Sequence, residues 1–110
     1  MALDDATFDS LAGETLEAWF DAIEAAGLDD LEVELGEGIL TVNVESGGTF
    51  VLNKHAPMRQ LWLSSPYSGA THYSFDPAGQ RWINTRGGQD LATLLADELG
   101  RAGGGRLVLE

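Results

Sequence analysis

The chain has 110 residues, the size of one ordinary domain, and carries 18 acidic against 6 basic residues, for a formal net charge of −12. It contains no cysteine, which excludes disulfides, a cysteine nucleophile, and any thiolate-held zinc or iron–sulfur site made by this chain alone. A surface this negative repels phosphate backbones and anionic lipid, so we expect neither nucleic acid nor membranes as partners.

An amphipathic helix is predicted from about residue 4 to residue 26. Apolar residues recur there at steps of three and four, from Phe8 to Ala26, as expected of one buried helix face. Four acidic side chains line the opposite face: Glu14, Glu17, Asp21 and Glu24. No Lys or Arg lies between them, and like charges four residues apart destabilise a helix. The acidic N-terminus also lacks a basic or apolar targeting pattern, which predicts a cytoplasmic location.

A series of short strands follows the helix. Alternation of polar and apolar residues predicts them over 31–35, 39–45, 49–54, 59–64, 72–75 and 81–84. Short turns containing glycine join the first three, which is typical of an antiparallel meander. Glu32 and Glu34 on the exposed side of the first strand are expected to extend the acidic surface of the helix.

A second helix is predicted from Asp90, a plausible N-cap, through a repeat of leucines that ends at Gly100. We interpret the glycines at 103–105 as a flexible connection to a short apolar tail. Strands grouped between two terminal helices favour the α+β class. The predicted fold is a two-layer sandwich, formed by one domain over residues 1–110, with both helices on one face of a five- to six-stranded antiparallel sheet.

Trp62 is the aromatic residue of greatest interest. In the fourth strand, Leu61 and Leu63 alternate with Trp62, so Trp62 faces solvent if the leucines face the helices. Exposed tryptophans are enriched in binding hot spots. Six other aromatic residues are predicted to be core side chains: Trp19, Phe20, Phe50, Tyr73, Phe75 and Trp82.

The charge is unevenly distributed. The first 53 residues contain 13 acidic and no basic residues, whereas residues 54–110 contain 5 acidic and 6 basic residues. This asymmetry predicts one strongly negative surface and one mildly positive surface. A merely solvated helix face is the commoner explanation of an acidic run, and it stays open at this point.

No catalytic motif is found. His55 and His72 lack zinc-motif spacing, residues 64–66 do not form a nucleophile elbow, and the glycine run lacks the Lys and Ser or Thr of a P-loop. We therefore assign the two histidines a solvated or structural role. The sequence supports no enzyme active site.

The order and spacing of several residues resemble the frataxin family, and the length resembles its bacterial CyaY-like branch. The matching residues are Gly38 to Val42, Asn53, Lys54, Pro57, Gln60 to Pro66, Ser68, Gly69, Tyr73, Trp82 and the helix from Leu91 to Leu99. The resemblance covers nearly the whole chain and is most specific between Asn53 and Pro66. It implies two helices on an antiparallel sheet, in agreement with the order of elements.

The resemblance also implies an iron-binding regulator or iron donor in iron–sulfur cluster assembly. Its metal-binding acidic ridge corresponds here to eleven residues: Asp4, Asp5, Asp9, Glu14, Glu17, Asp21, Glu24, Asp29, Asp30, Glu32 and Glu34. The implied partners are a cysteine desulfurase and a cluster scaffold protein. They are expected to contact the acidic ridge and the exposed sheet at Asn53, Lys54, Gln60 and Trp62.

Carboxylates are hard ligands suited to Fe²⁺ and Fe³⁺. On the outside of a helix they stay hydrated, so weak binding of several ions is expected. A monomer is expected, with iron-dependent oligomers. Two alternatives remain: an acidic protein–protein adaptor with adventitious metal binding, and a ferroxidase that oxidises Fe²⁺.

Overall fold

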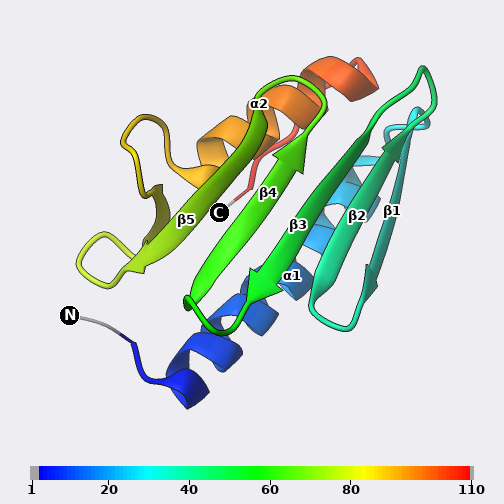
Figure 1. The fold of residues 1–110 in the computed structure, drawn as a ribbon. Helices are drawn as coiled ribbons and strands as arrows, with labels where there is room; N and C mark the ends of the chain where they lie inside the picture. The colour runs from blue at the N-terminus through cyan, green and yellow to red at the C-terminus, as the bar shows by residue number, and fades with distance from the viewer. Residues whose placement is uncertain (1–2, 110) are drawn as a thin grey trace.

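The computed structural model describes residues 3–109, which form a six-stranded antiparallel sheet with both helices on one of its faces (Figure 1). The elements in chain order are α1 (Asp5–Ala26), β1 (Leu31–Gly36), β2 (Ile39–Val44), β3 (Thr49–His55), β4 (Gln60–Ser65), β5 (Gly69–Asp76), β6 (Arg81–Asn84) and α2 (Leu91–Gly103). Each strand pairs with the next along the chain. The predicted α+β sandwich is confirmed, and the strand number is six.

The two helices begin and bury their apolar faces as their sequences predict. The Asp4 carboxylate accepts a hydrogen bond from the Thr7 N–H at 2.7 Å and caps α1. Asp90 precedes α2 at the predicted position, although its side chain makes no capping hydrogen bond. The buried side chains of α1 recur at three- and four-residue steps: Phe8, Ala12, Leu16, Trp19 and Ile23. Within residues 3–109, neither helix combines the length and the apolar character needed to cross a membrane.

The β1–β2 hairpin depends on its two turn residues. Glu37 and Gly38 have φ of 51° and 77°, the combination of a type I′ turn, whose twist matches that of the paired strands. The turn sets a register in which Leu35 pairs with Leu40 and Glu34 with Thr41. Leu40 is buried against the helices, so the side chain of Glu34 projects from the opposite face of the sheet.

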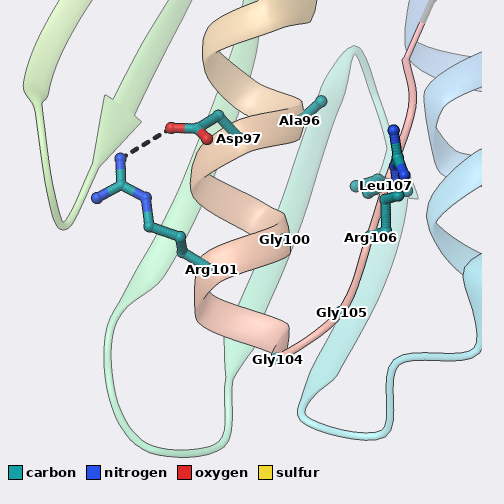
Figure 2. Close-up of a pocket in the computed structure, with 8 residues that line it drawn as sticks. All are labelled: Ala96, Asp97, Gly100, Arg101, Gly104, Gly105, Arg106 and Leu107. Atoms are coloured by element: carbon teal, nitrogen blue, oxygen red, sulfur yellow. Dashed lines mark hydrogen bonds and ion pairs between the residues drawn. The ribbon is translucent and has the colours of Figure 1, made fainter.

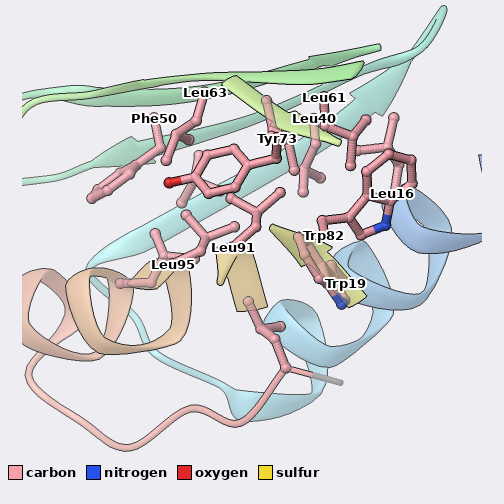
Figure 3. Packing of buried hydrophobic residues seen from close by; sticks show 14 of the residues in the cluster. Leu16, Trp19, Leu40, Phe50, Leu61, Leu63, Tyr73, Trp82, Leu91 and Leu95 are labelled. Carbon is pink, nitrogen blue, oxygen red and sulfur yellow. The ribbon is translucent and has the colours of Figure 1, made fainter. Parts of the chain in front are cut away.

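The hydrophobic core lies between the sheet and the helices (Figure 3). Alternate strand residues form its upper wall: Leu40, Val42, Phe50, Leu52, Leu61, Leu63, Tyr73 and Trp82. Four of the six aromatic residues predicted for the core are buried, and Phe20 and Phe75 pack against it partly buried. Burial also raises the pKa of the Tyr73 phenol above its usual value. Leu61 and Leu63 both face the helices, so Trp62 lies on the sheet face turned away from them, here called the open face.

A buried carboxylate fastens the β4–β5 loop to α2. Glu98 is only 5% exposed, and its Oε1 accepts hydrogen bonds from Ser65 Oγ at 2.6 Å and Ser68 Oγ at 3.2 Å. Ser65 Oγ in turn accepts the N–H groups of Tyr67 and Ser68. These bonds satisfy the buried polar groups and hold the loop in one conformation.

Two local predictions are wrong. The glycines at 103–105 are not a flexible connection: Gly103 ends α2, Gly104 has φ of 70°, and a Cβ on Gly105 would lie 2.3 Å from Leu28 Cδ2. The run is therefore a tight turn that brings the tail back, so that Leu109 is buried in the core. β5 is also longer than predicted, because Gly69, Ala70 and Thr71 pair with β4 although they show no polar–apolar alternation.

Candidate metal-binding and docking surfaces

All eleven residues of the acidic ridge are exposed. They occupy four places: the start of α1, its outer face, the α1–β1 loop, and β1. The two strand residues do not extend the helix surface as predicted. Glu34 pairs with Thr41 and Glu32 with Asn43, which places both carboxylates on the open face, around the edge of the sheet from α1.

Three ridge carboxylates at the start of α1 already have partners. Asp4 caps the helix, Asp5 Oδ1 accepts a hydrogen bond from Arg59 Nε at 2.7 Å, and Asp9 pairs with the Lys54 ammonium group. The two basic residues come from the end of β3 and from the β3–β4 turn, so the fold supplies cations that the helix sequence lacks. A metal ion at Asp5 or Asp9 would have to compete with these cations.

The pKa of Asp4 is lowered, and the main cause is the hydrogen bond that its carboxylate accepts from the Thr7 backbone N–H. A lowered pKa in the folded state contributes stability that is present above the usual aspartate pKa and is lost as the pH falls through the lowered value.

We expect Asp4→Ala to lower the melting temperature by a few degrees at pH 7. The difference from the wild type should shrink near pH 2, and thermal scans at the two pH values measure it. Asp4→Asn, which keeps a capping oxygen, should retain most of the stability; an equal loss in both variants would contradict capping as the cause.

The outer face of α1 carries the unpaired part of the acidic ridge. Four carboxylates follow one another there: Glu14, Glu17, Asp21 and Glu24. Within residues 3–109 none of the four makes an ion pair. All four side chains are exposed, so a cation from solution can reach them.

The α1–β1 loop provides a second acidic surface. Asp29, Asp30, Glu32 and Glu45 line a shallow hollow of about 370 Å³ beside the β1–β2 pair. The Asp30 carbonyl accepts the Glu45 N–H at 2.8 Å and holds the loop against the end of β2. No group of three or more His, Asp or Glu side chains among residues 3–109 is arranged to hold one metal ion. The ridge is thus a set of separate carboxylates and not a preformed metal centre.

The predicted docking residues lie in two places. Asn53 and Trp62 pair across β3 and β4, and Gln60 lies on the same open face two residues before Trp62. Gln60 Oε1 accepts a hydrogen bond from Trp62 Nε1 at 2.8 Å. Lys54 instead points to the helix side, where it pairs with Asp9. Lys54 therefore borders the acidic ridge, and the other three residues form the docking surface on the sheet.

The two histidines that the sequence analysis assigned a solvated or structural role, His55 and His72, flank Trp62. The ring centroids of His55 and Trp62 lie 3.7 Å apart with an interplanar angle of 6°, and those of Trp62 and His72 lie 4.1 Å apart at 8°. Trp62 is consequently only partly exposed, although its predicted face is correct. The predicted third strand stopped at residue 54 and so left His55 outside it, whereas β3 includes His55. The register that stacks the three rings was not available from the sequence.

Sequence comparison places the chain in a family. Residues 1–105 match the model of the frataxin-like domain. The chain belongs to the frataxin family. It is 38% identical over 96 residues to the iron-sulfur cluster assembly protein CyaY of Azotobacter vinelandii, covering 87% of this chain and 86% of that protein. It is also 38% identical over 96 residues to the mitochondrial frataxin of Dictyostelium discoideum, of which it covers 50%.

Structural comparison agrees with the membership in the frataxin family. A trimeric yeast frataxin complexed with ferrous ion superposes with a TM-score of 0.75 at 29% identity, over 94% of this chain and 89% of that one. Frataxin from Psychromonas ingrahamii superposes with a TM-score of 0.85 over 96% of this chain. At 23% identity the second match shows the fold alone.

A hollow at the end of α2 lies apart from these frataxin-family surfaces (Figure 2). It measures about 430 Å³ and lies between the last turns of the helix and the returning tail. Arg101 pairs with Asp97 at 2.8 Å, which also raises the pKa of Arg101. Arg106 also lines the hollow, and the remaining lining is glycine, Ala96 and Leu107. Because its one carboxylate is paired and its other charges are positive, the hollow is unsuited to a metal ion.

Proposed function

We propose that this protein is an iron-binding regulator and iron donor in iron–sulfur cluster assembly. In this proposal the acidic ridge carries Fe²⁺ or Fe³⁺ as cargo, while the open face and the adjoining ridge dock on a cysteine desulfurase and a cluster scaffold protein. Membership in the frataxin family supports it, together with the names of the bacterial CyaY relatives and the ferrous complex of a yeast relative. The cytoplasmic location stays a prediction.

The observation that carries the proposal is the row of unpaired carboxylates on the outer face of α1. Carboxylate oxygen is a hard ligand and suits ferrous and ferric iron. Because these side chains are exposed, lack neighbours that fix them, and form no preformed metal centre, we expect weak binding of several ions. Weak and accessible binding suits the transfer or sensing of iron better than its storage.

One observation favours the alternative of an acidic adaptor with adventitious metal binding. The ridge carboxylates are dispersed, and two of them are neutralised by Arg59 and Lys54. In the adaptor, the ridge would meet a basic patch on the partner, and cations would be held only as a diffuse atmosphere. Ferroxidase activity stays a prediction from the family resemblance.

A triple variant of the ridge tests the metal-binding part of the proposal. We expect Glu17→Gln, Asp21→Asn and Glu24→Gln together to weaken Fe²⁺ binding severalfold and, by relieving like-charge repulsion, to raise the melting temperature slightly. Anaerobic titration calorimetry measures the first effect and a thermal scan the second. The matched control removes three charges from other elements through Glu37→Gln, Asp76→Asn and Asp97→Asn.

The comparison between the two triple variants separates the alternatives. Site binding predicts loss of affinity in the ridge variant only, and affinity that persists at raised ionic strength. If instead both triple variants lose the same Fe²⁺ affinity, and raised ionic strength abolishes Fe²⁺ binding by the wild type, the result would support the adaptor. Capture of a purified cysteine desulfurase or scaffold protein by the wild type tests the docking part of the proposal. If the wild type captures neither protein, the docking part is overturned.

We also propose a monomer that associates when loaded with iron. Yeast relatives whose structures are trimeric support the capacity of the fold to associate. Sedimentation velocity with and without Fe²⁺ measures this property directly.

A further inference from the structure

The three stacked rings on the open face form a single structural unit. Trp62 lies between His55 and His72, which come from the neighbouring strands β3 and β5, and both imidazoles are nearly parallel to the indole. All three side chains are partly exposed. Both faces of the indole are therefore covered within the protein itself, so a docking partner meets the edge of Trp62 and the outer surfaces of the two imidazoles.

Hydrogen bonds fix the orientation of two of these rings. Trp62 Nε1 donates to Gln60 Oε1, and His55 Nδ1 accepts the backbone N–H of Met58 at 3.3 Å. An imidazole nitrogen that accepts a hydrogen bond carries no proton, so this contact requires an unprotonated His55 Nδ1. Protonation of Nδ1 would break the bond to the β3–β4 turn.

Among residues 3–109, the strand neighbours of the two imidazoles on the open face carry no carboxylate. Next to His55 on the open face lie Asn53 and Gln60, which are neutral, with Met58 and the Asp5-paired Arg59 in the adjoining turn. His72 is flanked on its own strand by Ala70 and Ser74, and Arg86 from the β6 end lines the same hollow of about 440 Å³. Arg59 near His55 is neutralised by its ion pair with Asp5. Arg86 is the charged side chain that lines the hollow beside His72, and its positive charge opposes additional positive charge on that ring.

We propose that His55 and His72 are docking residues of the open face, that they act in their neutral form with Trp62 as one three-ring surface, and that docking on the scaffold protein therefore weakens as the pH falls. This inference rests on the proposed function and adds the regulation of its docking surface. The physical reason is desolvation. Docking removes water from the imidazoles, and burial disfavours an imidazolium that has no counter-charge.

The expected size of the effect follows from proton linkage. For an imidazole that must be neutral on docking, the affinity falls by up to about tenfold for each pH unit over the range in which the free protein protonates it. Docking at intermediate pH should also release protons into the buffer.

Titration calorimetry of the full chain with a purified iron–sulfur scaffold protein tests the inference. We expect wild-type affinity to be at least about tenfold lower at pH 5.5 than at pH 7.5, at constant ionic strength. The double variant His55→Gln and His72→Gln should dock more weakly than the wild type at pH 7.5, and its remaining affinity should lose most of the pH dependence. Repeating the titration near pH 6.5 in two buffers of different ionisation enthalpy counts the released protons, which should fall towards zero in the double variant.

Controls assign the pH dependence to these two residues. The single variants His55→Gln and His72→Gln should each lose part of the dependence, and they replace the double variant if it does not fold. The ridge variant Glu17→Gln, Asp21→Asn and Glu24→Gln should keep the wild-type dependence. Docking that is equally pH-dependent in wild type and double variant would assign the titration to the partner and overturn the inference, as would pH-independent wild-type docking. Absence of docking at both pH values would overturn the docking part of the proposed function as well.

Discussion

Replacement of Trp82 by alanine is expected to destabilise the protein by about 3–5 kcal/mol, a large fraction of the stability of a small domain. Trp82 is 4% exposed and packs edge-on against Phe8 of α1, with ring centroids 6.1 Å apart, and against Phe75 of β5 at 5.2 Å. Its Nε1 donates to Thr15 Oγ1 of α1 at 3.1 Å. Truncation therefore opens a cavity where the last strand is joined to the first helix.

Thermal and urea unfolding measure this effect. A loss of this size should lower the melting temperature by more than about 12 °C. Trp82→Phe should lose much less stability, because phenylalanine keeps most of the buried apolar area and gives up only the hydrogen bond to Thr15. Val108→Ala, at a residue 63% exposed, serves as the control and should be nearly neutral. A melting temperature of Trp82→Ala within a few degrees of the wild type would show that β6 and α1 are not held together by this residue.

The fold could be predicted because the spacing of apolar residues indicates which face of each helix and strand is buried. The three- and four-residue steps of α1 and the alternation of Leu61 and Leu63 with Trp62 fix the sides that meet in the core. Turn residues such as Gly38 then limit how the strands can pair. Where alternation fails, as in Gly69 to Thr71 of β5, the prediction failed too.

The candidate site was less predictable because its contacts depend on the register and on the tertiary packing. Lys54 and Asp9 are 45 residues apart in the sequence, and only the placement of α1 under the end of β3 brings them together. The stack around Trp62 likewise needs the pairing of Trp62 with His72 across β4 and β5. Alternation identifies the side of a strand on which a residue lies but not its neighbour on the next strand.

The acidic ridge shows the same limit. The exposure of the carboxylates within α1 and β1 followed from the amphipathic patterns of these two elements. Their division between the helix layer and the open face was not predicted. The alternation in β1 places Glu32 and Glu34 opposite its apolar residues, but only the packed structure shows that this face turns away from α1. The separation matters for function, since a metal ion bound at Glu17 and a partner contacting Glu34 would be on different faces of the molecule.

Replacement of Trp62 by alanine is expected to leave the fold nearly intact and to weaken docking on the scaffold protein by about 30-fold or more. Trp62 lies outside the buried core, so its removal costs the stacking on His55 and His72 but opens no cavity between sheet and helices. The melting temperature should therefore change by only a few degrees. A tryptophan at the centre of a docked surface contributes about 2 kcal/mol or more to binding, which corresponds to the stated loss of affinity.

Calorimetry with the scaffold protein and a thermal scan of the same sample separate these effects. Ile83→Ala supplies the matched control. Ile83 of β6 is 38% exposed and projects from the open face, yet it lies outside the three-ring unit. Its docking should stay close to the wild-type value. If Trp62→Ala docks normally, the open face is not the docking surface, and recognition would rest on the acidic ridge alone. Asn53 and Gln60 would then lose their assigned role together with Trp62, since all three act through the same face, whereas Lys54 beside the ridge would keep its own.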